Sequence, residues 1–152
     1  MRVVTATETT THAAAGDVAT GFLERLAAQE LDAAFDLLAD DVEWINVTLP
    51  TVRGRQRIER LIRALDGRGR FRVHFHHLAV EGDTVLTERT DELAVGPFAQ
   101  RFWVYGRFEI RDGKIAVWRD SFDWLDILVS LVRAAAGAIS PGLNRRWPGP
   151  GE

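Results

Sequence analysis

The stretch Val85-Leu-Thr-Glu-Arg-Thr-Asp-Glu-Leu93 alternates apolar and polar residues between two turn signals, Gly82-Asp83 and Gly96-Pro97. This pattern predicts a β-strand. Side chains in a strand alternate between its two faces. The face with apolar residues at both ends is the better candidate for the interior, and it consists of Val85, Thr87, Arg89, Asp91 and Leu93. The other face is mostly polar and suits solvent, with Leu86, Glu88, Thr90 and Glu92.

The interior face of this strand carries two charged groups, Arg89 and Asp91. An unpaired buried charge is costly even after the surroundings relax, so these groups need a partner elsewhere in the chain. Residues 114–122 predict a further strand, on which Trp118, Asp120 and Phe122 share one face. Asp120 is therefore the natural partner of Arg89 and Asp91.

The remaining elements follow from apolar periodicity and turn signals. Helices are expected over residues 13–29, from Asp32 onward, over 54–65 with Ile58, Leu61, Ile62 and Leu65 inward, and from about 123 to 138. The final helix carries an apolar stripe of Trp124, Ile127, Leu128, Leu131 and Ala135. Strands are expected over residues 42–48, 71–80, 85–93, 98–110 and 114–122. Helices followed by antiparallel strands predict an α+β domain in which a curved sheet surrounds a pocket.

Length and composition indicate one domain over residues 13–140, between a disordered N-terminal tail (1–12) and a flexible C-terminal tail (141–152). A net charge of -3 and the lack of a Lys/Arg block argue against nucleic acid as a partner. No apolar run approaches the roughly 20 residues that span a bilayer. The absence of Cys and of a signal peptide favours the cytoplasm.

Two histidines share a strand face, His74 and His76, but two imidazoles leave a zinc site short of ligands. We therefore expect no metal site. The arginines along residues 54–65 are typical of a solvated helix face.

The inward faces of three strands now hold two aspartates, an arginine, an asparagine and aromatic residues. The pieces Thr87-Glu-Arg-Thr-Asp91 and Trp118-Arg-Asp-Ser-Phe-Asp123, with Asn46 upstream, resemble limonene-1,2-epoxide hydrolases. The resemblance covers most of the chain. It implies a cone formed by a strongly curved mixed sheet with helices on its concave side, similar to cystatin-like and nuclear-transport-factor-like folds. It also implies a homodimer that needs neither metal nor organic cofactor.

The resemblance implies a role for each residue of this group. Asp120 would be the general base that takes a proton from water, and Asp91 the general acid that protonates the oxygen of a small apolar epoxide. Arg89 would lie between the two carboxyl groups, and Asn46 would accept the second hydrogen of the water. The apolar wall of the pocket would comprise Leu65, Leu93, Phe102, Val104, Trp118 and Phe122.

One position departs from the family pattern. Where the family typically has a tyrosine two residues before the asparagine, this chain has Trp44. The indole N–H can still donate a hydrogen bond to the water.

Two other function classes stay open: an isomerase or polyketide cyclase of the ketosteroid-isomerase or SnoaL type, and a non-catalytic carrier of small lipophilic molecules. An Arg89–Asp91–Asp120 network can also be purely structural.

Overall fold

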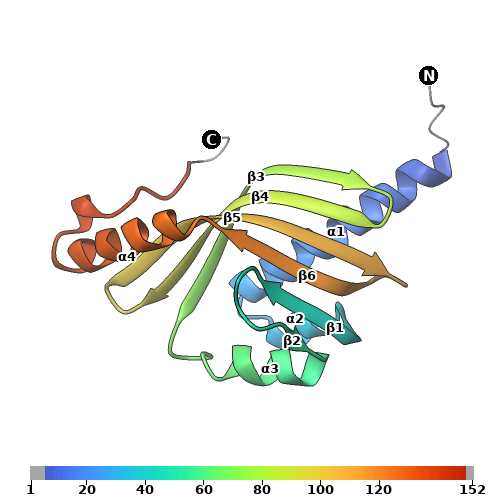
Figure 1. Cartoon of the computed structure of the whole chain (residues 1–152), viewed down its shortest axis with the longest axis horizontal. Coiled ribbons are helices and arrows are strands. Elements are labelled where there is room, and N and C mark those ends of the chain that lie inside the picture. Colours follow the sequence, from blue (N-terminus) through green and yellow to red (C-terminus); the bar gives the residue numbers. More distant parts are fainter. Residues whose placement is uncertain (1–5, 150–152) are drawn as a thin grey trace.

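Six strands form one curved sheet in the order β2-β1-β6-β5-β4-β3 (Figure 1). The structure is a computed structural model that describes residues 6–149, with side chains from residue 14 onward. The strands are β1 (Leu38–Asn46), β2 (Val52–Arg53), β3 (Arg70–Glu81), β4 (Thr84–Val95), β5 (Phe98–Arg111) and β6 (Lys114–Phe122). The helices are α1 (Ala6–Ala27), α2 (Leu31–Phe35), α3 (Arg55–Arg63) and α4 (Trp124–Ile139), and a 3-10 turn, η1, spans Pro141–Leu143.

Strands β3 to β6 form a continuous antiparallel meander. Its tight turns need left-handed backbone, which Gly82 (φ 58°) and Gly96 (φ 54°) supply without steric cost. Strand β1 then pairs parallel with β6, so the first and last strands are neighbours in the middle of a mixed sheet. The α+β class and the curved sheet predicted from the sequence are therefore confirmed, and so is the mixed strand pairing that the family resemblance implies.

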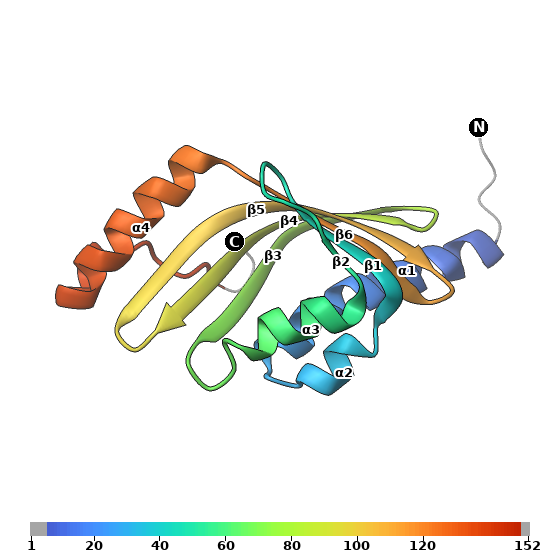
Figure 2. The same cartoon turned by 60° about the horizontal axis from the view of Figure 1, so that its bottom comes forward.

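Helices α1, α2 and α3 cover the concave face of the sheet (Figure 2). Between them and the strands lies the hydrophobic core, in which full burial of one large apolar side chain contributes about 1.5–3 kcal/mol. Its side chains with relative exposure of 2% or less include Phe22, Leu23, Phe35, Leu38, Val42, Ile58, Val85, Phe108 and Ile115. This core fixes β4, β5 and β6 from the concave side and so sets the position of the residues that face it.

Helix α4 lies apart from the other three helices, at the far end of the sheet, where it packs on β5 (Figure 1). Its first turn is capped by Asp123, whose Oδ1 accepts hydrogen bonds from the backbone N–H groups of Leu125 (2.9 Å) and Asp126 (3.2 Å). The predicted apolar stripe of this helix is largely exposed at Trp124, Leu128 and Leu131. The buried residues are instead the small ones, Ser130, Ala134 and Gly137.

Small residues allow the backbone of α4 to approach β5 closely. The side-chain amide of Gln100 on β5 donates hydrogen bonds to the carbonyl of Ile127 (3.3 Å) and to Oγ of Ser130 (3.1 Å). A Cβ at Gly137 would come within 2.6 Å of Asn144. The large side chains must therefore point outward.

The predicted burial of the inward face of β4 is confirmed from Val85 to Asp91 but is wrong at Leu93. Val85, Thr87, Arg89 and Asp91 are buried, whereas Leu93 is 46% exposed. On the opposite face Thr90 and Glu92, expected in solvent, are also buried.

Three arginines and the C-terminal segment (residues 141–149) account for the burial of Glu92. Arg101 Nε lies 2.6 Å from Glu92 Oε2, and Arg70 and Arg72 lie 3.4 and 3.5 Å from Oε1. Arg101 also donates to the carbonyl of Arg145 in the C-terminal segment. Ion pairs on the convex side of the sheet therefore bury Glu92, a position that was expected to face water.

The ends of the chain differ from the predicted tails. Residues 6–12 form the first turns of α1, and residues 1–5 and 150–152 lie outside the described residues. The C-terminal segment packs back on the sheet: Asn144 Nδ2 donates to the Ala99 carbonyl (2.9 Å), and Arg145 pairs with Asp126 (2.5 Å).

Helix α3 buries Ile58, but Leu61 and Leu65, expected inward, are 47% and 64% exposed. Arg63 is exposed, as expected, and its guanidinium lies 5.0 Å over the ring of Phe35 and pairs with Asp32 at 2.5 Å. The helix therefore turns its basic edge toward α2. Among the described residues, no helix combines the length and the apolar character needed to cross a bilayer.

Candidate active site

Strand pairing brings the predicted polar residues into neighbouring rows on the concave face of the sheet. Thr87 on β4 pairs with Gly106 on β5, Gly106 pairs with Asp120 on β6, and Asp120 pairs with Asn46 on β1. A second row contains Arg89, Val104 and Phe122. The residues that the sequence placed on separate inward faces thus become neighbours.

The guanidinium of Arg89 joins the two carboxyl groups. Its Nε lies 3.0 Å from Asp91 Oδ1 and 3.2 Å from Oδ2, and its Nη2 lies 2.7 Å from Asp120 Oδ1. The remaining terminal nitrogen, Nη1, donates to Thr87 Oγ1 at 3.1 Å. Relative exposure is 0% for Arg89, 6% for Asp91 and 4% for Asp120. The predicted triad therefore exists as a buried acid–arginine–acid bridge.

Burial raises the pKa of Asp91 to about 6 because it disfavours the charged carboxylate. The positive charge of Arg89 lowers this pKa, while the negative charge of Asp120 raises it. Burial likewise raises the pKa of Asp120, against the lowering effect of Arg89. For Arg89 itself, burial lowers the pKa, but the two aspartates outweigh burial and the net shift is upward. Three buried groups thus hold one fixed positive charge and two carboxyls that protonate easily.

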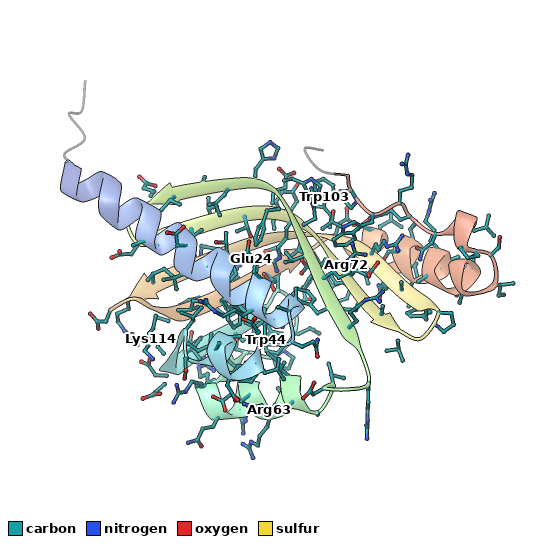
Figure 3. All side chains as sticks on the ribbon, turned by 180° about the vertical axis from the view of Figure 1, so that it is seen from behind. Glu24, Trp44, Arg63, Arg72, Trp103 and Lys114 are labelled. Atoms are coloured by element: carbon teal, nitrogen blue, oxygen red, sulfur yellow. The ribbon has the colours of Figure 1, made fainter. Side chains whose placement is uncertain are left out.

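Two tryptophans stack beside this bridge. The rings of Trp44 on β1 and Trp118 on β6 are 4.6 Å apart and nearly parallel, at 15°. Both indole N–H groups are buried, and neither has a hydrogen-bond partner within the described part of the chain. The indole of Trp118 lowers the pKa of Asp120, in the same direction as Arg89. Figure 3 shows Trp44 in the part of the molecule that α1, α2 and α3 cover.

The predicted pocket wall is only partly brought to the bridge. Phe102 and Val104 are buried and pair with Asp91 and Arg89 across β4 and β5. Phe122, half-buried, lies with its ring centroid 6.0 Å from that of Phe102. Leu93 and Leu65 are exposed, and no contact places either beside the bridge.

The sequence analysis assigned no role to Thr87, which it placed on an interior face, or to Gly106. The available signal was a glycine in the interior of a long strand, which often marks a close approach of other atoms to the backbone.

A surface hollow of about 670 Å³ lies on the convex side of the sheet, away from the bridge. Its lining includes His76, Trp103, Tyr105 and Trp147. The rings of His76 and Trp103 stack at 4.3 Å, and the guanidinium of Arg72 lies 4.0 Å over the ring of Trp147. In Figure 3, Trp103 and Arg72 lie on the side of the C-terminal segment. This hollow is therefore separate from the candidate site.

Within residues 6–149, no group of three or more His, Asp or Glu side chains is arranged to hold a metal ion. His74 and His76 are near each other, with ring centroids 4.8 Å apart. The absence of a metal or organic cofactor stays a prediction.

The fold places the chain among nuclear-transport-factor-like proteins. It is similar to a solved structure described as a candidate ketosteroid isomerase from Kribbella flavida (TM-score 0.63, 18% identity), covering 74% of this chain and 79% of that one. It is also similar to a candidate polyketide cyclase from Xanthomonas campestris (TM-score 0.67, 16% identity), covering 80% of this chain and 98% of that one. At these identities the likeness defines the fold alone.

Closer relatives define the family. The sequence model of the limonene-1,2-epoxide hydrolase catalytic domain matches residues 13–133. The chain is 40% identical over 123 residues to epoxide hydrolase EphG of Mycobacterium tuberculosis, covering 81% of this chain and 83% of that protein. The structure of an M. tuberculosis limonene-epoxide-hydrolase-like enzyme matches with a TM-score of 0.86 and 37% identity, over 90% of this chain and 97% of that one. The chain belongs to the limonene-1,2-epoxide hydrolase family.

Proposed function

We propose that this protein hydrolyses an apolar epoxide to a vicinal diol by direct attack of water, in one concerted acid–base step. The observation that carries the proposal is the buried bridge, in which a single arginine holds two carboxyl groups of raised pKa. The names of the M. tuberculosis relatives, both epoxide hydrolases, support the reaction class.

Opening an epoxide with water requires that the nucleophile lose a proton while the leaving oxygen gains one. In the proposed step Asp120 takes a proton from water, the water oxygen bonds to an epoxide carbon, and the C–O bond breaks. Asp91 gives its proton to the released oxygen. General acid and general base each contribute typically about 100- to 10,000-fold to such reactions. Transfer of one proton from Asp120 to Asp91, directly or through water, restores the starting state.

The electrostatics of the bridge suit a shared single proton. Two carboxylates beside one arginine carry excess negative charge, and burial penalises that charge. One proton on the pair leaves Arg89 balanced by one carboxylate. The pair therefore titrates as a unit, and the singly protonated form is the active one. With the pKa of Asp91 at about 6, this form is favoured at mildly acidic pH.

Asn46 and Trp44 are proposed to hold the attacking water. Asn46 pairs with Asp120 across β1 and β6, so its side chain projects from the same row as the general base. The buried N–H of Trp44 has no hydrogen-bond partner among the described residues and can donate to a water lone pair. This donor would replace the phenol that the family typically has at this position.

The substrate is proposed to be a small apolar epoxide, because Phe102 and Val104 pair with the acid and the arginine. A homodimer in the cytoplasm that works without metal or cofactor is proposed from the family resemblance and the composition.

The test is hydrolysis of limonene oxide and cyclohexene oxide by purified protein that has been treated with a chelator. Single-turnover reaction in 18O-labelled water should place the label in the diol and none in the protein. Label that first enters an aspartate would show a covalent ester and refute the direct-water step. Unchanged release of a bound epoxide would favour a carrier, and proton exchange on a ketone substrate would favour an isomerase.

A further inference from the structure

Arg89 reaches Asp120 by crossing an intervening strand. Arg89 and Asp91 belong to β4 and Asp120 to β6, while β5 lies between them. The guanidinium passes over Gly106 of β5. A Cβ built on Gly106 would lie 2.1 Å from Arg89 Nη1, 2.5 Å from Thr87 Oγ1 and 3.2 Å from Asp120 Oδ1. The first two distances are shorter than real Cβ contacts, so a side chain at this position cannot coexist with the bridge as it stands.

The backbone gives no other reason for glycine at position 106. Glycines at the turns, such as Gly82 and Gly96, have positive φ, and a Cβ there would meet nothing within 4 Å. Gly106 is the reverse case, because it lies inside the longest strand, its φ is not in the left-handed region, and the space above it is filled. Glycine inside a strand weakens the strand, so close approach is the remaining physical reason for it.

We propose that Gly106 and Thr87 are positioning residues for the acid–arginine–acid bridge. Gly106 leaves the space through which the Arg89 guanidinium reaches both aspartates, and Thr87 fixes the rotation of that guanidinium by accepting from Nη1. Thr87 Oγ1 lies at the edge of hydrogen-bond distance from the Gly106 carbonyl (3.5 Å), so its hydroxyl proton can point away from Arg89 and leave a lone pair for Nη1. Because Nε, Nη1 and Nη2 all make hydrogen bonds, the guanidinium is held in one orientation.

This inference rests on the proposed function for its kinetic effect, but not for its effect on the carboxyl groups. A methyl group at position 106 should displace the guanidinium and remove the positive charge that lowers the pKa of Asp91 and Asp120. Both carboxyls should then protonate at higher pH. An active site misplaced by about 1 Å can lose about 100-fold in rate.

The experiment compares Gly106→Ala, Thr87→Val and Thr87→Ser in the full chain. Gly106→Ala should lower kcat on cyclohexene oxide about 100-fold, with little change in KM, and should move the acid limb of the kcat/KM profile to higher pH. Thr87→Val keeps the shape but loses the acceptor, and should cost about tenfold. Thr87→Ser keeps the acceptor and should restore activity and pH profile. The carboxyl titrations of the aspartates, followed by 13C NMR, should shift upward in Gly106→Ala.

Gly16→Ala is the matched control, because an added Cβ there meets only ordinary contacts with Val80 (3.4 Å) and Leu78 (3.5 Å). It should leave both the rate and the carboxyl titration unchanged. If Gly106→Ala folds with wild-type rate and wild-type titration, the positioning role is refuted. If Gly106→Ala does not fold, Thr87→Val decides, and an unchanged pH profile and titration for it would overturn the proposal. Wild-type protein that hydrolyses no epoxide would instead refute the proposed function, while the NMR titrations would still test the positioning role.

Discussion

Replacing the two aspartates singly and together tests two properties of the bridge: whether it is catalytic, and whether the charge of Arg89 is compensated by the two carboxyl groups. Arg89 has no solvent exposure and holds Asp91 at 3.0 Å and Asp120 at 2.7 Å. In Asp120→Asn the arginine keeps one carboxylate. Loss of the neighbouring negative charge should also lower the pKa of Asp91, so that the remaining pair is neutral. We therefore expect Asp120→Asn, and likewise Asp91→Asn, to fold with modest loss of stability.

The double variant Asp91→Asn/Asp120→Asn should behave differently, because it leaves a buried guanidinium without any anion. Removal of the last partner of a buried charge typically costs about 3–5 kcal/mol. For a chain of this size, that corresponds to a fall in Tm of about 6–20 °C. Urea unfolding followed by circular dichroism measures the loss for each variant. The stability loss of the double variant should exceed the sum of the losses of the two single variants.

Activity separates the catalytic role from the structural one. Each single variant should lose about 100- to 10,000-fold in kcat, because an amide neither takes the proton from water nor releases one to the epoxide. A folded single variant with full activity would refute the assigned roles. A double variant as stable as the wild type would show that Arg89 does not depend on these two partners, and the electrostatic argument would fail.

Four further predictions concern the site and its surroundings. Because burial raises the pKa of Asp91 to about 6, kcat should fall about tenfold per pH unit above that value; a flat profile from pH 6 to 9 would contradict the assignment of the acid. The same raised pKa means that the folded protein binds a proton that the unfolded chain releases, so Asp91 should make wild-type stability decrease by about 3 kcal/mol between pH 4 and pH 6. Asp91→Asn should make this decrease smaller in urea titrations, and the raised pKa of Asp120 accounts for the part that remains. Trp44→Tyr, which retains a donor, should keep more kcat than Trp44→Phe, and equal rates for the two would remove Trp44 from the water site. Glu92→Gln should weaken the pairing with Arg101 and the attached C-terminal segment, which faster proteolysis of that segment would report. Glu109→Gln is the control, because Glu109 is half-buried and pairs with Arg107 on the same strand.

The second half of the fold follows directly from local chemistry. Residues 114–122 form a strand with the predicted boundaries, and β5 extends only one residue beyond prediction. The turn between them forms at Asp112-Gly113, where both residues have positive φ. Such turn signals act within a few residues, so the sequence alone is enough to locate them.

Burial patterns that depend on distant segments were not predictable in the same way. Glu92 is buried because arginines from β3 and β5 and the C-terminal segment cover it, and no local pattern around residue 92 records that cover. Helix α4 turns its small residues to β5 and its large ones outward, against the usual pattern of an amphipathic helix. In both cases, packing of separate elements outweighs local hydrophobicity.

For the site, alternation within β4 and β6 was enough to place Arg89, Asp91 and Asp120 inward. The role proposed for Gly106 depends on the register of three adjacent strands, and local patterns in a single sequence do not predict that register. Trp44 was identified from its offset to Asn46, and the structure adds its stack on Trp118.

The parallel pairing of β1 with β6 has a consequence for biosynthesis. Asp120 and Asn46 come from opposite ends of the domain, so their pairing forms late and at high cost in chain entropy. While the chain emerges from the ribosome, Arg89 has Asp91 but must wait for the last strand to gain its second anion. Nascent fragments that end before β6 should therefore remain open, bind chaperones and have no hydrolytic activity.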